Sequence, residues 1–104
     1  MDGELRVLAE NQAAICSVFA NPRRVLILWT LTEHEKSVTE IAETVGFSLQ
    51  NTSQHLHLMK EKGILDSRRE AQTIYYRIAE NELANSCLLL WQAQKAKAKQ
   101  GNSI

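Results

Sequence analysis

The chain has 104 residues, and its 12 basic and 12 acidic side chains give a formal net charge of zero. This length accommodates a single domain, residues 1–104, and leaves no room for a second hydrophobic core. An apolar fraction of 44% is too high for a disordered chain, and four glycines with one proline are too few for a β-sandwich or barrel. We therefore expect a mainly helical protein. The zero net charge gives no sign of nucleic-acid binding, which is usually accompanied by a basic excess.

Sequence features that define several other functional classes are absent. No apolar segment is long enough to span a membrane, and the start Met-Asp-Gly-Glu lacks a secretory signal, so we expect a cytoplasmic protein. The sequence has no glycine-rich phosphate loop, metalloprotease motif or nucleophile elbow. We therefore expect neither an enzyme nor a cofactor.

The first predicted helix runs from Gly3 to about Ala20 and is apolar on an unusually wide face. Its apolar residues form two neighbouring stripes, Leu5, Leu8, Ile15 and Phe19 in one and Val7, Ala14 and Val18 in the other. A surface helix needs only one stripe. The extra width predicts burial on two sides, against the rest of the domain and against a second subunit.

Three further helices follow with clear start and stop signals. Asn21 is a predicted cap with Pro22 at the first helical position, and that helix continues to Thr32 as a core element. Ser37 and Glu40 have capping-box spacing, and their helix ends at Gly46. The next helix begins at Ser48 and runs to Lys62. The short gap between the last two predicts a helix-turn-helix.

The C-terminal part is predicted to form a hairpin followed by a last helix. Ile64 to Arg69 and Thr73 to Ile78 are strand-forming runs separated by three turn residues. The last helix runs from Glu80 to about Lys97 and again has a wide apolar face, while about 98–104 is expected to be a frayed tail.

The helix from Ser48 to Lys62 presents two contrasting faces. At ~100° per residue, one face should pack on the core, and its residues are Leu49, Thr52, Leu56 and Met59. The opposite face is polar, and its residues are Gln50, Ser53, Gln54 and His57, with Lys60 nearby. Uncharged amides and hydroxyls hydrogen-bond to base edges without repulsion from phosphates. An ordinary solvated helix face explains the same pattern equally well.

Two basic segments favour the nucleic-acid interpretation. The hairpin tip carries Arg68, Arg69 and Gln72, which are suited to phosphates or a minor groove, although a solvated turn has similar composition. Asn21 with Arg23 forms a helix N-terminus that offers N–H groups and positive charge to a phosphate. Three weak signals in this order are stronger than any one of them.

The order of these motifs resembles the ArsR/SmtB family of bacterial winged-helix repressors. Four segments carry the resemblance, Ala20 to Leu28, Ser37 to Ala42, Ser53 to Leu65 and Arg68 to Ile78. It implies a mainly α winged helix-turn-helix of four helices, a β-hairpin and a fifth helix. It also implies a homodimer through the first and last helices, bound to a palindromic operator of double-stranded DNA, with base-reading residues at Gln50, Thr52, Ser53 and Gln54. The full candidate DNA-binding set is Asn21, Arg23, Gln50, Asn51, Thr52, Ser53, Gln54, His57, Arg68, Arg69 and Gln72.

The resemblance also bears on metal and redox sensing. The positions of the family's metal-binding cysteines hold Ser37 and Thr39, whose hydroxyls are poor ligands for soft metals, so we expect no metal site. The wing is similar to that of the thiol-switch branch, but Trp29 stands where one of its cysteines would be, and Cys87 at the other. Cys16 is a possible replacement partner. The alternative is that both cysteines are simply buried thiols.

We interpret the sequence as a dimeric DNA-binding repressor. Two alternatives stay open, a winged helix used for protein interaction, and an ArsR-like regulator controlled by an apolar ligand or partner protein. The stretch from Thr44 to Ala79 holds five basic residues against three acidic ones. This slight excess predicts modest affinity for random DNA, so that recognition depends on the dimer and on one polar helix face.

Overall fold

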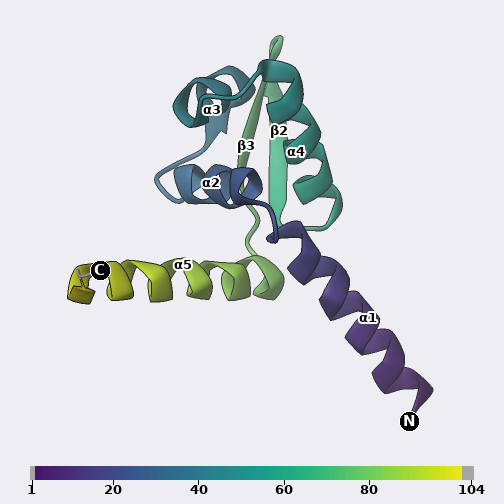
Figure 1. The fold of residues 1–104 in the computed structure, drawn as a ribbon. Helices are drawn as coiled ribbons and strands as arrows, with labels where there is room; N and C mark the ends of the chain where they lie inside the picture. Colours follow the sequence, from purple (N-terminus) through teal and green to yellow (C-terminus); the bar gives the residue numbers. More distant parts are fainter. Residues whose placement is uncertain (1, 102–104) are drawn as a thin grey trace.

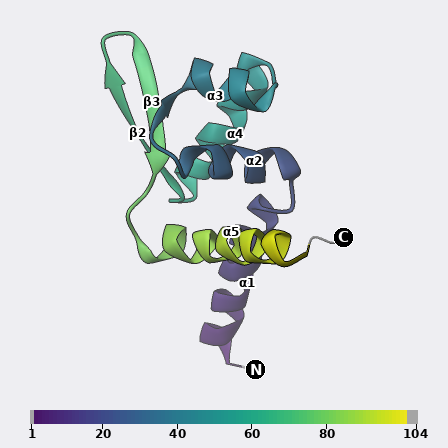
Figure 2. The same ribbon diagram turned by 90° about the vertical axis from the view of Figure 1, so that its left-hand side faces the viewer.

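The computed structural model describes residues 2–101, and these form five helices and three strands (Figure 1). In chain order they are α1 (Gly3–Val18), α2 (Pro22–Leu31), β1 (Lys36–Ser37), α3 (Val38–Val45), α4 (Leu49–Glu61), β2 (Leu65–Glu70), β3 (Thr73–Ile78) and α5 (Glu82–Gly101). The β2–β3 hairpin stands beside α4, and α2 and α3 complete the central body (Figure 1). The first and last helices project from the end of this body opposite the hairpin tip, as Figure 2 also shows.

The helix starts follow the predicted capping chemistry. The Asn21 side chain accepts hydrogen bonds from the N–H groups of Arg23 at 2.9 Å and Arg24 at 3.4 Å. Ser37 and Glu40 form the predicted capping box, with hydrogen bonds of 3.1 and 2.9 Å. Gly46 ends α3 in the left-handed region, at φ 78°. Glycine adopts that conformation without a steric penalty. The chain can therefore turn sharply into α4 and form the predicted helix-turn-helix.

The hairpin belongs to a three-stranded antiparallel sheet, so the predicted pair of strands was incomplete. The order is β1-β3-β2, and Lys36 pairs with Tyr76 while Ser37 pairs with Tyr75. A strand of two residues is too short to show an alternating pattern, which is why the sequence did not reveal it. The hairpin turn holds two residues rather than the expected three, and Ala71 occupies it at φ 57°.

The core lies where α2, α3 and α4 meet the sheet. Its fully buried side chains include Ile27, Ile41, Leu56, Met59 and Ile64. Thr52 is also fully buried, as the helical wheel predicted for the inner face of α4. The prediction for Leu49 was wrong, because its side chain is 53% exposed. Leu49 is the first residue of α4, and the wheel assumed that the core covers the whole length of the helix.

The two outer helices leave large apolar side chains uncovered. Leu5, Val7 and Leu8 in α1 and Leu89 and Leu90 in α5 are each more than half exposed. The predicted contact of the first helix with its own domain is confined to its C-terminal part, where Val18 is buried. Exposed apolar surface of this kind indicates an interaction site.

The last helix is longer than the sequence analysis predicted. An Asn81 side chain caps it, accepting a hydrogen bond from the Ala84 N–H at 2.7 Å. The helix continues to Gly101 because alanine, lysine and glutamine are good helix formers. Residues 98–101 of the expected frayed tail are therefore helical, and 102–104 lie outside the described residues. No helix between residues 2 and 101 has the length and apolar character needed to cross a membrane.

Candidate nucleic-acid interface

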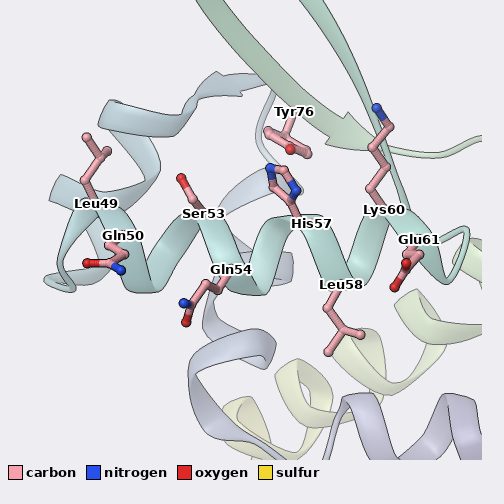
Figure 3. Close-up of a pocket in the computed structure, with 9 residues that line it drawn as sticks. All are labelled: Leu49, Gln50, Ser53, Gln54, His57, Leu58, Lys60, Glu61 and Tyr76. Carbon is pink, nitrogen blue, oxygen red and sulfur yellow. The ribbon is translucent and has the colours of Figure 1, made fainter.

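The polar face of α4 lines an open groove of about 1060 Å³ beside the hairpin. Nine side chains line this groove, Leu49, Gln50, Ser53, Gln54, His57, Leu58, Lys60, Glu61 and Tyr76 (Figure 3). Ser53, His57 and Lys60 point toward the hairpin, while Gln50 and Gln54 point to the other side of the helix (Figure 3). Gln50, Gln54 and His57 are exposed, and Ser53 is partly so. The helix thus offers a row of uncharged hydrogen-bonding groups to an external partner.

Two residues of the candidate set on α4 face elsewhere. Thr52 is fully buried, and its hydroxyl has no hydrogen-bond partner among the described residues. It lies on the inner face with Leu56 and Met59, where base edges cannot reach it, so the prediction that Thr52 reads bases is wrong. Asn51 is half-buried, and its side-chain oxygen accepts a hydrogen bond from Arg23 Nη1 at 2.9 Å. Asn51 therefore positions the Arg23 side chain.

The N-terminus of α2 lies close to the start of α4. The Arg23 guanidinium is exposed and sits 4.5 Å from the centre of the Phe47 ring, while it also donates to Asn51. The side-chain oxygen of Asn21 is already used to cap α2. Arg24, by contrast, donates its Nε–H to the Val18 carbonyl at 2.7 Å. Of these residues, Arg23 is the one that presents a charge beside α4.

The two hairpin arginines lie on opposite faces of the sheet, because adjacent residues of a strand alternate in direction. Arg69 pairs with Ile74 and Ser67 with Tyr76, which places Arg69 on the face that carries the groove residue Tyr76. Arg69 is exposed and forms no ion pair with any residue that the structure describes. Gln72 is exposed in the turn. The same alternation, applied to the sequence alone, would have predicted that Arg68 and Arg69 lie on opposite faces of the hairpin.

Arg68 lies on the outer face of the sheet, opposite to the face that carries Arg69 and Tyr76, and Glu35 and Glu70 hold it there. It donates to Glu35 at 2.8–3.1 Å and to Glu70 at 2.9 Å. The hydrogen bonds from Arg68 hold the pKa of the Glu35 carboxyl below its ordinary value. Glu35 lies 33 positions away in the sequence, and no local pattern indicates such a pair.

The two histidines of α4, His55 and His57, lie on different sides of the helix. His57 faces the groove, whereas His55 is half-buried on the other side with its Nε2 unpartnered among the described residues. Burial lowers the pKa of His55, and the nearby charges of Arg24 and Arg23 lower it further. Within residues 2–101, no three histidine, cysteine or acidic side chains are grouped so that they could hold a metal ion.

The cysteines lie on the two outer helices. Cys16 on α1 is exposed, and Cys87 on α5 is half-buried. Burial raises the pKa of the Cys87 thiol, and the neighbouring Cys16 raises it further. Trp29, which occupies the other thiol-switch position, packs against Trp91 of α5 with ring centres 4.8 Å apart. The contact between α2 and α5 at Trp29 is therefore aromatic.

Comparison with known proteins identifies the family. Residues 21–73 match the model of the MarR family. The chain is 44% identical over 68 residues to the nodulation protein NolR of Rhizobium meliloti, an alignment that covers 65% of this chain but only 56% of that protein.

Two solved structures cover nearly the whole chain. The homodimeric winged helix-turn-helix DNA-binding domain Mb0332 of Mycobacterium bovis, a possible ArsR-family regulator, matches with a TM-score of 0.82 and 28% identity over 100% of this chain and 96% of that one. The transcriptional repressor BigR of Xylella fastidiosa matches with a TM-score of 0.78 and 30% identity over 94% of this chain and 97% of that one. The chain therefore belongs to the MarR family of winged-helix transcriptional regulators.

Proposed function

We propose that the chain is a transcriptional repressor of the ArsR type that binds a palindromic operator as a homodimer. The observation that carries this proposal is the set of uncharged hydrogen-bonding side chains on α4, where Gln50, Ser53 and Gln54 line the groove. Amide side chains form bidentate hydrogen bonds with adenine in the major groove, and a helix of this size fits that groove. The groove is lined by one basic and one acidic side chain, Lys60 and Glu61, so its charge is too small for recognition by charge alone.

The proposed contacts divide into base reading, backbone contact and positioning. Gln50, Ser53, Gln54 and His57 read base edges from α4. Arg69 and Gln72 contact the phosphate backbone or the minor groove from the hairpin tip, and Arg23 contacts a phosphate beside the N-terminus of α2. Asn21 and Asn51 act indirectly, since the first caps α2 and the second holds Arg23.

The homodimer is supported by the uncovered apolar side chains of α1 and α5. Two copies of these helices packed together would bury the exposed leucines, which a single copy leaves in water. A two-fold dimer matches a palindromic operator whose half-sites are separated by about one helical turn, roughly 34–36 Å. We propose residues 1–104 as one DNA-binding and dimerisation domain acting in the cytoplasm.

The ArsR assignment within the broader family rests on the four motif segments from Ala20 to Ile78. It is supported by the similarity to Mb0332, a possible ArsR-family regulator, and to the repressor BigR. The test is to select bound duplexes from a random-sequence pool with the purified chain. Recovery of an inverted repeat with half-sites one turn apart supports the proposal, and recovery of no common sequence contradicts it.

We also propose that Cys16 on α1 and Cys87 on α5 form a redox-sensitive pair, because they lie on the two helices that the proposed dimer would pack together. Joining them releases two protons and two electrons, which an oxidant such as hydrogen peroxide accepts. Non-reducing electrophoresis and operator binding before and after mild peroxide treatment test this, with Cys16→Ser as control. Unchanged mobility and affinity in the wild type would exclude it and leave two inert thiols.

A further inference from the structure

The guanidinium of Arg68 is surrounded by groups that satisfy it within the protein. Its Nε and Nη2 donate to both carboxylate oxygens of Glu35, at distances of 2.8 to 3.1 Å. Its Nη1 donates to Glu70 at 2.9 Å, and its central carbon lies 4.6 Å from the centre of the Tyr75 ring. Arg68 is therefore engaged by two carboxylates and one aromatic ring at the same time.

The sheet register explains how a residue from before β1 reaches the hairpin. Arg68 lies opposite Tyr75, and Tyr75 lies opposite Ser37, so the three form one row across β2, β3 and β1. Glu35 comes two residues before Ser37 and meets Arg68 above Tyr75. Arg68 thus receives two of its three charged nitrogen contacts from a residue outside the hairpin.

Neighbouring Arg69 is the natural comparison. It has the same charge and lies one residue nearer the tip, but it forms no ion pair among the described residues. Only one of the two adjacent arginines is therefore free to meet an external anion. The remaining cation of the outer face, Arg77, lies 3.7 Å from Asp66.

The Glu35 carboxylate binds Arg68 in the way that a DNA phosphate would bind it. A carboxylate that binds both Nε and Nη2 occupies the same sites that a phosphate occupies on an arginine fork. The Arg68 and Glu35 side chains are 49% and 34% exposed, and ion pairs so open to water contribute little to folding stability. The main consequence of the Arg68–Glu35 ion pair is therefore that it limits the binding of Arg68 to external anions.

We propose that Glu35, assisted by Glu70, acts as an internal phosphate mimic that keeps Arg68 away from the DNA backbone and so lowers the affinity for random DNA. This inference rests on the proposed DNA-binding function and adds a specificity determinant to it. Glu35 is a positioning residue, because it acts through Arg68. Its carboxylate raises the ratio of operator to random binding by suppressing the sequence-independent contribution.

The experiment compares Glu35→Gln with the charge-matched control Glu43→Gln. Glu43 is exposed on α3 and forms no ion pair among the described residues, so both variants raise the net charge by one and only the first removes the carboxylate that binds Nε and Nη2 of Arg68. We expect Glu35→Gln to raise the affinity for a random duplex several-fold above the control. It should also steepen the plot of log affinity against log salt by up to ~0.9 for each additional phosphate that the protein neutralises.

A second variant separates release of Arg68 from a general change in charge or shape. Arg68→Gln in the wild-type background should change random-duplex affinity little, and Glu35→Gln/Arg68→Gln should lose the gain. Equal affinities and salt slopes for Glu35→Gln and Glu43→Gln, or a gain that persists in the double variant, overturn the inference while leaving the proposed function intact. Failure of the wild type to prefer its selected operator over random DNA overturns both.

Discussion

Arg23 donates a hydrogen bond of 2.9 Å to the side-chain oxygen of Asn51, and this contact joins the first turn of α2 to the first turn of α4. The same guanidinium rests on Phe47 in the turn between α3 and α4. The helix that carries the polar face is therefore braced at its N-terminal end, which is the end that reads bases in helix-turn-helix proteins. A braced helix keeps its amides in a fixed register and loses less entropy when it binds.

Gln54→Ala should reduce specific binding more than non-specific binding. The Gln54 amide is exposed on the groove face of α4 and offers a donor and an acceptor to one base. We expect a loss of about 1–3 kcal/mol of operator affinity with little change for a random duplex. Fluorescence anisotropy with both duplexes measures the ratio, and Gln94→Ala, an exposed amide on α5, is the control. A Gln54 variant with the wild-type ratio would show that α4 does not read bases through this residue.

Arg69→Ala should weaken binding to all duplexes alike. Because Arg69 is the hairpin arginine that has no ion-pair partner among the described residues, its removal leaves a DNA phosphate without its cation. The slope of log affinity against log salt should become shallower by ~0.9 for each phosphate that the variant no longer neutralises. Arg68→Ala is the matched control, since the same charge is removed from an arginine already neutralised by Glu35. The assignment is wrong if the two variants reduce the slope equally.

Local signals were sufficient for most of the fold and for part of the site. Capping residues such as Asn21 and Ser37 predicted the helix starts, because their chemistry acts on backbone groups only two or three residues away. The exposure of Leu49 and the pairing of Arg68 with Glu35 depend on which distant segments meet in space. Periodicity carries no information on such contacts. Thr52 shows the same limit, since a motif position indicated base reading while its place on the wheel indicated the core.

Leu8→Glu should convert the proposed dimer into a monomer. Leu8 on α1 is 61% exposed in a single chain, and a buried carboxylate at a dimer interface is strongly unfavourable. Sedimentation velocity should show a single species of half the mass, and affinity for the palindrome should fall to that for one half-site. Leu49→Glu introduces the same change at a leucine that is 53% exposed on α4, and that variant should stay dimeric. A dimeric Leu8 variant would place the subunit interface elsewhere.

The stability of the fold should decrease as the pH falls below about 6.5 because of His55. Burial and the charges of Arg24 and Arg23 hold the folded-state pKa of His55 below its ordinary value of 6.5. The unfolded chain therefore takes up this proton at a higher pH than the folded chain. The stabilisation is fully present above the unfolded pKa and is lost as the pH falls from there toward the folded pKa. Urea unfolding between pH 8 and pH 5 measures this slope.

His55→Gln removes the titrating group and should flatten that pH dependence. His57→Gln is the control, because His57 lies exposed in the groove on the other side of the same helix. We expect the His57 variant to keep the wild-type slope. If His55→Gln loses stability with falling pH as steeply as the wild type does, the pH dependence arises from groups other than His55.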